Sequence, residues 1–151
     1  MRILSVGSLS GMSNTCLHRN WALHKVADEV DEINTQLNPI TLWGRICYHL
    51  FFLGLPIRIP ENNKENEKIC KMVKNKDYDI VWIDKGHTIL PSTLKYIKKI
   101  SPNTIIVSYS PDNMALRHNQ TQQYLETIPL YDYFFTNKSY ILDNMRKLGA
   151  K

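Results

Sequence analysis

The sequence predicts an α/β protein built on a Rossmann-like, doubly wound parallel sheet of about five strands, with helices on both faces. Two observations predict this fold. Apolar segments of strand length alternate along the chain with segments of helical periodicity. Several strand segments are apolar at nearly every position, which is typical of parallel strands covered on both faces. With 151 residues and 43% hydrophobic content, residues 1–151 have the size of a single domain with one core.

The five expected strands are rich in β-branched and aromatic residues, and most of them end at glycine or at polar residues. The third and fourth, YDIVWID and TIIVSYS, are the strongest, whereas the second alternates only weakly. In chain order the strands are expected at residues 2–7, 30–35, 78–84, 104–110 and 131–136.

Helical periodicity fills the intervals between the strands. Ser13 or Asn14 can cap the first helix, Pro91 suits the first turn of a later one, and Gly149 suits the end of a last helix over residues 139–148. The residues expected to share helical faces are Leu17, Trp21, His24 and Ala27; Leu42, Trp43, Ile46, Cys47, Leu50 and Phe51; Ile69, Met72 and Val73; and Leu94, Ile97 and Ile100.

Charge and cysteine content indicate which classes of partner and which cellular compartment to expect. The net charge of +5 is dispersed along the chain, so we expect no nucleic-acid partner, while anionic small ligands and a lipid surface stay open. Cys16, Cys47 and Cys70 lie far apart, which predicts neither a disulfide framework nor a zinc site. No signal-peptide core follows Met1, and a cytoplasmic location is expected.

Residues 39–59 are the most apolar stretch of the chain, but basic residues interrupt it and Pro56 shortens it below a membrane span. A helix packed on the sheet is the favoured interpretation. The alternative is an interfacial helix with Trp43 and Phe51 toward lipid and basic side chains above them, which would give peripheral membrane contact.

In an open α/β sheet, ligands bind beyond the carboxyl ends of the strands, so the loops there are the candidate sites. The loop after the first strand, GSLSGMS, combines glycines that permit close backbone approach with N–H groups that could hold an anion. It lacks the dinucleotide pattern G-x-G-x-x-G, and a plain tight turn is an equal alternative. Its candidate ligand-binding residues are Gly7, Ser8, Ser10 and Gly11.

The loop after the third strand places Asp84, Lys85, Gly86 and His87 in succession. This combination could bind hydroxyls or transfer a proton, so His87 is a candidate catalytic residue and Lys85 and Gly86 are candidate ligand-binding residues. The structural alternative is that Asp84 pairs with Lys85 and that His87 caps the next helix.

The turn after the fourth strand contains Asp112, the second candidate catalytic residue, together with the candidate ligand contacts Asn113 and His118. Turn chemistry explains residues 111–113 by itself, because proline fixes φ and Asx side chains bond to nearby backbone. It does not explain the polar cluster that follows, which consists of Arg117, His118, Asn119 and Gln120. Asp132, within the fifth strand, is expected to be a structural hydrogen-bond acceptor.

Together these stretches resemble the N-terminal domain of GT-B glycosyltransferases, specifically the CgeB-like (spore-maturation-protein-like) group. The resemblance rests on RILSVGSLSG, YDIVWIDKGHTILPSTL, VSYSPDN and IPLYDYFFTNKSYILDNMRKLGA, and it is specific from residue 78 to residue 150. It implies that this domain binds a hydroxyl acceptor while a C-terminal domain holds most of the nucleotide-sugar donor. The three loops would then line the interdomain cleft, with no metal or other cofactor required.

The resemblance also implies which residues could act as the catalytic base and that the donor-binding domain is missing from this chain. Asp112, His87 or His118 could be the base of an inverting transfer, although Asn113 stands where many relatives carry a second acidic residue. The chain stops two residues after Gly149, where a further strand would be expected, so we expect the front half of a longer protein that is inactive alone. The alternatives are a non-catalytic binding module and a flavodoxin-like nucleotide-binding enzyme.

Overall fold

The computed structural model describes residues 1–12, 14–35 and 38–151. It contains a five-stranded sheet in the order β2-β1-β3-β4-β5, and every neighbouring pair is parallel. The Rossmann-like doubly wound α/β fold expected from the sequence is therefore confirmed. The strands are β1 (Arg2–Gly7), β2 (Glu29–Asn34), β3 (Ile80–Asp84), β4 (Ile105–Ser110) and β5 (Tyr133–Thr136).

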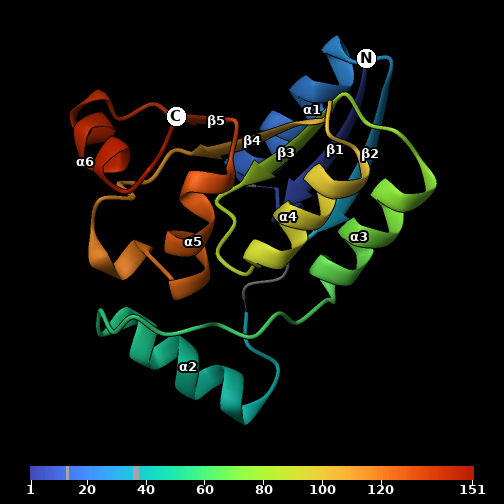
Figure 1. The fold of residues 1–151 in the computed structure, drawn as a ribbon. Coiled ribbons are helices and arrows are strands. Elements are labelled where there is room, and N and C mark those ends of the chain that lie inside the picture. The colour runs from blue at the N-terminus through green and yellow to red at the C-terminus, as the bar shows by residue number, and fades with distance from the viewer. Residues whose placement is uncertain (13, 36–37) are drawn as a thin grey trace.

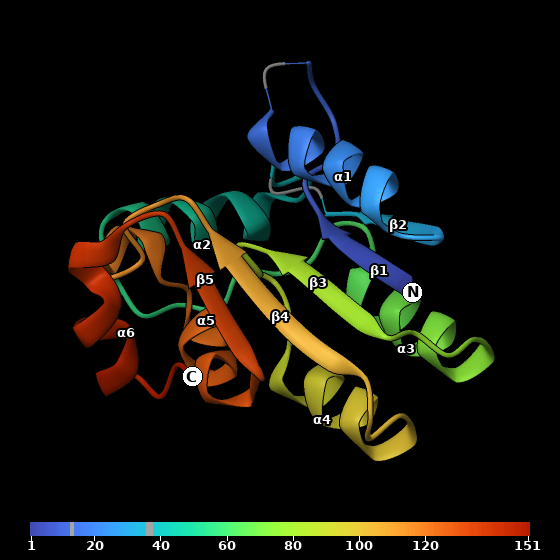
Figure 2. The same cartoon turned by 90° about the horizontal axis from the view of Figure 1, so that it is seen from above.

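Helices lie on both faces of the sheet. Figure 2 shows α1 on one face and α3, α4 and α5 on the other, and these two sides are called here the α1 face and the α3/α4 face. The helices are α1 (Thr15–Val26), α2 (Leu42–Phe52), α3 (Glu65–Asn75), α4 (Pro91–Ile100), α5 (Gln122–Thr127) and α6 (Leu142–Lys147), with short 3-10 helices η1 (Arg117–Asn119), η2 (Ile128–Leu130) and η3 (Ser139–Ile141).

The main core fills the α3/α4 face, as strand alternation requires. On β3, Val81 and Ile83 are fully buried on this face while Trp82 points to the other. Each such buried aliphatic side chain stabilises the fold by about 1.5–3 kcal/mol. The apolar positions expected on α3 and α4 are in this core, except that Ile100 is exposed at the end of α4. The core includes Leu4, Val6, Ile69, Val73, Leu94, Ile97 and Ile106.

The α1 face is covered only in part. α1 lies over β1 and β2 (Figure 2), and on β5 Tyr133 and Phe135 are 52% and 49% exposed. The expected inward face of α1 is wrong, because Trp21 and His24 are exposed. The buried side of α1 carries Cys16 and Asn20 instead, since this helix is attached to the sheet largely through polar contacts.

The expectation that α2 packs on the sheet is also wrong. α2 lies apart from both layers, beyond the carboxyl ends of the strands (Figure 1), and α3 occupies the sheet face between β2 and β3. The inner side of α2 carries Gly44, Cys47 and Phe51, which are buried, and α2 packs against η1. None of the described helices is long and apolar enough to cross a membrane.

Several local signals hold in the structure. Asn14 caps α1 by accepting a hydrogen bond from the Cys16 amide, while the alternative cap Ser13 lies outside the described residues. Pro91 occupies the first turn of α4, and Gly149 has a φ of +96° just after α6. Asp132 is structural, as expected: its Oδ2 accepts a hydrogen bond from the Ile106 amide at 2.7 Å.

Candidate functional site

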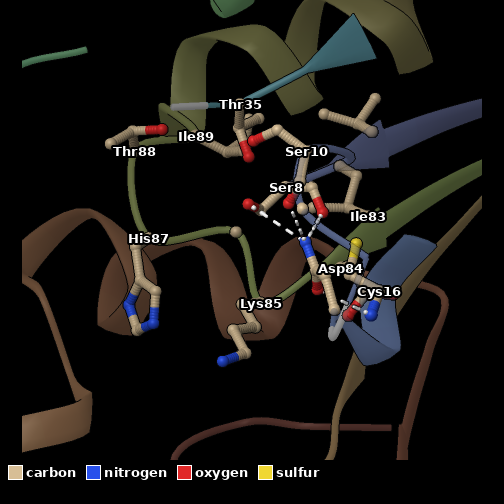
Figure 3. A pocket seen from close by; sticks show the side chains of 14 residues that line it. Ser8, Ser10, Cys16, Thr35, Ile83, Asp84, Lys85, His87, Thr88 and Ile89 are labelled. Atoms are coloured by element: carbon tan, nitrogen blue, oxygen red, sulfur yellow. Dashed lines mark hydrogen bonds between the residues drawn. The ribbon is translucent and has the colours of Figure 1, made fainter. Parts of the chain in front are cut away.

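A pocket of about 410 Å³ opens at the carboxyl edge of the sheet, between the ends of β1 and β3 (Figure 3). The topology explains its position. β1 leads into α1 on one face and β3 leads into α4 on the other, so the two connections diverge at this switch point and leave a crevice. The lining residues with polar or catalytic potential are Ser8, Ser10, Asn14, Thr35, Asp84, Lys85, His87 and Thr88; Gly11 and Gly86 also line it.

The side-chain amide of Asn14 makes several of the hydrogen bonds that hold the loop after β1. The Asn14 side chain donates hydrogen bonds to the carbonyl oxygens of Ser8 and Ser10, the second at 3.1 Å. Its own oxygen accepts from the Cys16 N–H at 3.0 Å. Asn14 therefore ties residues 8 and 10 of the loop to the start of α1.

The two glycines of this loop have different roles. Gly11 lines the pocket with a φ of +90° and nothing within 4 Å of the position of an added Cβ, so its backbone conformation favours glycine. Gly7 is not in the pocket lining. An added Cβ there would lie 2.5 Å from Cys16 Sγ and 2.9 Å from Asp84 Cβ. Close packing beneath the loop therefore requires glycine at position 7, and its expected ligand role stays a prediction.

The loop after β3 begins with two residues in the left-handed region. Lys85 has a φ of +64° and Gly86 a φ of +70°, and such a conformation is costly for a residue with a side chain. A Cβ on Gly86 would also lie 2.8 Å from the Tyr131 hydroxyl. The surrounding structure must therefore hold this loop in place.

The first turn of α3 provides that support. The Thr88 hydroxyl donates to the fully buried Glu65 carboxylate. The Asn66 side chain donates to the Thr88 carbonyl at 2.9 Å and accepts from the Leu90 amide at 2.9 Å. The second half of the loop is thus bonded to α3, while the Lys85 amide at its start donates to the Tyr109 carbonyl of β4 at 2.9 Å.

Asp84 does not pair with Lys85, and the expectation of that pair is wrong. Its buried carboxylate accepts from the Arg19 guanidinium of α1, with an Nε to Oδ2 distance of 2.8 Å. The guanidinium carbon also lies 4.4 Å from the centre of the Tyr109 ring. Strand alternation directs Asp84 to the α1 face, and the left-handed turn at Lys85 directs the next side chain elsewhere.

Lys85 pairs instead with Asp112, whose carboxylate lies 2.7 Å from its Nζ. The two side chains are 35% and 41% exposed, so solvent and a ligand can reach both charges. This pair brings the loop after β3 to the turn after β4. Asp112 is not in the pocket lining itself but is attached to its rim through Lys85.

His87 lines the pocket but does not cap α4, because Leu90 is at that position. Its ring packs between Phe51 of α2 at 5.8 Å and Tyr124 of α5 at 6.0 Å. Burial, and secondarily the Lys85 ammonium, lower the pKa of His87 to about 4. The imidazole is therefore neutral near pH 7, and its buried Nδ1 has no hydrogen-bond partner among the described residues.

Two expected ligand contacts lie outside the pocket lining. Asn113 closes its own turn: its side chain accepts from the Ala115 amide at 3.1 Å, and its backbone carbonyl accepts from the Asn119 side chain at 2.9 Å. His118 is exposed in η1, next to α2. The polar cluster after Asp112 is thus explained largely by local turn bonding.

Sequence reasoning missed Arg19, Thr35 and Thr88. The bond between Arg19 and Asp84 joins positions 65 residues apart, so no local pattern could reveal it. Cys16, also unassigned, has its pKa raised to about 12 by burial and the neighbouring Asp84 carboxylate, which makes its thiol a poor nucleophile. Across the described ranges no group of three or more His, Cys, Asp or Glu side chains could hold a metal ion.

The fold and the pocket together define a Rossmann-like α/β domain with a ligand-sized cavity at its topological switch point. No protein-family model matches the sequence, and a search of curated proteins finds no significant match.

Proposed function

We propose that this chain is the acceptor-side domain of a CgeB-like GT-B glycosyltransferase, which moves a sugar from a nucleotide-sugar donor to a hydroxyl acceptor. The observation that carries the proposal is the pocket between β1 and β3 with the pair of Lys85 and Asp112 at its rim. About 410 Å³ is within the usual range for small-molecule sites.

The lining of the pocket suits a ligand with several hydroxyl groups. Ser8, Ser10 and Thr88 contribute hydroxyl groups, and the neighbouring backbone contributes further donors and acceptors. Lys85 adds a cation that could contact a phosphate or sugar oxygen. Such groups bind a carbohydrate acceptor or the near end of a nucleotide sugar by hydrogen bonding.

Asp112 is the better candidate for the base of an inverting transfer. Its carboxylate would take the proton of the acceptor hydroxyl while the acceptor oxygen bonds to the anomeric carbon. The bond from that carbon to the donor phosphate would break, and the nucleoside diphosphate would leave with the electron pair. His87 is less suited, because its Nδ1 is buried and its ring packs between Phe51 and Tyr124, whereas the Asp112 side chain is 41% exposed.

The binding part of the proposal can be tested on the chain as it stands. Isotope-labelled protein would be titrated with UDP-glucose, with other nucleotide sugars, and with oligosaccharide acceptors, and amide chemical shifts would be followed by NMR. We expect the largest changes at residues 8–11 and 85–88, with smaller ones at Asp112. Changes confined to other surfaces, or no change with any probe, would contradict the proposal. In the same samples the chain alone should transfer no sugar.

A further inference from the structure

The outer surface of α2 and the turn that follows it expose large apolar side chains. Six of them lie between residues 42 and 55, and each is 44–75% exposed. Isolated exposed apolar residues are ordinary, but a contiguous group marks an interaction site. This group is called here the α2 surface and consists of Leu42, Trp43, Ile46, Phe52, Leu53 and Leu55.

This surface is not needed to hold α2 on the domain. The inner side of the helix, with Cys47 and Phe51 buried, already makes that attachment. Leu42, Ile46 and Leu53 are spaced four and seven residues apart, so they lie together on a different side of the helix and its terminal turn. A helix that packs against one partner requires a single apolar stripe, and α2 has a second one.

Charge identifies what would cover the second stripe. Residues 33–60 contain no Asp or Glu, whereas Arg45, His49 and Arg58 all lie in this interval. Arg58 is paired with Glu126 at 2.7 Å, while Arg45 is exposed and has no ion-pair partner within the described part of the chain. A second copy of this surface would offer no acidic side chain to Arg45. Anionic lipid headgroups offer negative charge beside an apolar phase, and Trp43 suits the boundary between them.

We infer that the α2 surface docks on an anionic lipid bilayer. Leu42, Trp43 and Ile46 enter the boundary between headgroups and acyl chains, and Arg45 contacts lipid phosphates. The ring centres of Phe51, on the inner side of α2, and His87, in the pocket lining, lie 5.8 Å apart. Docking through α2 therefore holds the pocket close to the membrane. The inference rests on exposure and charge alone and does not depend on the proposed reaction.

Flotation of the full chain with vesicles tests the inference. Wild-type protein should bind vesicles of phosphatidylcholine mixed with phosphatidylglycerol more tightly than vesicles of phosphatidylcholine alone, and the difference should shrink in high salt. Trp43→Ser and Ile46→Ser should each weaken binding at least about tenfold, because each removes a large apolar side chain from lipid. Arg45→Gln should weaken binding only to the anionic vesicles.

The chain offers matched controls on α1. Trp21→Ser and Val26→Ser change exposed apolar residues of another helix and should leave binding unchanged. Brominated acyl chains should quench wild-type tryptophan fluorescence but not that of the Trp43→Phe variant. The inference is overturned if wild-type protein does not bind, if the control variants weaken binding equally, or if quenching survives in Trp43→Phe. It is also overturned if sedimentation shows a lipid-free dimer that Trp43→Ser dissociates, since the occupant is then a second copy.

Discussion

Two ion pairs at the carboxyl edge of the sheet begin at adjacent residues and differ in nearly every respect. The Asp84 carboxylate is buried and bonded to two nitrogens of Arg19. The Lys85 ammonium, one residue later, pairs with the Asp112 carboxylate, and both side chains are partly exposed to solvent. The first joins a strand to the helix that covers it, and the second joins two loops around a pocket.

The difference teaches which charges belong to the scaffold and which to the site. A buried pair that loses one partner leaves an uncompensated charge, so it is costly to disturb and poorly suited to exchange partners with a ligand. A half-exposed pair contributes little to stability and can be opened at little cost. We therefore assign Arg19 and Asp84 to structure, and we propose that Lys85 and Asp112, which solvent reaches, are the charges available to a ligand.

The largest effect should follow from removing one member of the buried pair. Asp84→Ala leaves the Arg19 guanidinium without its carboxylate and should lower the free energy of unfolding by about 3–5 kcal/mol. Denaturant unfolding followed by circular dichroism measures it. The double variant Arg19→Met with Asp84→Leu should recover much of this loss. A loss below about 1 kcal/mol for Asp84→Ala would place this pair in the same class as the exposed one.

The strained turn between the two pairs gives the next effect. Gly86→Ala puts a Cβ at a φ of +70° and 2.8 Å from the Tyr131 hydroxyl, and it should cost about 1–3 kcal/mol. Lys85→Gly is the matched control, because it removes a side chain from a φ of +64° and should change stability by no more than about 1 kcal/mol. Thermal unfolding of both variants tests whether position 86 requires glycine. Equal losses of stability in the two variants would contradict that requirement.

Acid should reveal the packing of His87, which lines the pocket beside both pairs. Its pKa is about 4 in the folded chain and about 6.5 in an unfolded one. The unfolded chain then binds more protons between these values, so this residue makes stability fall as pH drops from about 6.5 toward about 4 and leaves it unchanged above. Unfolding midpoints across this range should show that slope, and His87→Phe should flatten it. A slope that persists unchanged in the variant would exclude His87 as its origin.

The smallest stability change should come from the exposed pair. Lys85→Met removes the ammonium from a half-exposed site and should alter the free energy of unfolding by less than about 1 kcal/mol. Ligand-induced chemical shifts at residues 8–11 should nevertheless become weaker. A stability loss as large as that of Asp84→Ala would remove the distinction between the pairs.

The sequence predicted the sheet well and the contacts around the pocket only in part. Strand positions follow from apolar runs such as residues 104–110, and the position of the candidate loops follows from the topology of parallel strands. Contacts were harder to predict, because Arg19 meets Asp84 from a position 65 residues away in the sequence and the Lys85 side chain turns away through a positive φ. Helix faces failed where amphipathicity was weak or doubled, as in α1 and α2, since an apolar side chain can face a partner other than the sheet.

The central claim is that Asp112 serves ligand chemistry while contributing little to the fold. The most direct measurement is the sugar-transfer rate of Asp112→Asn in a complete transferase containing this domain, with Asp143→Asn as the control because Asp143 is an exposed carboxylate that pairs with an arginine. We predict that Asp112→Asn lowers the transfer rate at least about a hundredfold while its unfolding midpoint matches that of wild type. The control Asp143→Asn should match wild type in transfer rate. A transfer rate for Asp112→Asn equal to that of wild type would contradict the claim.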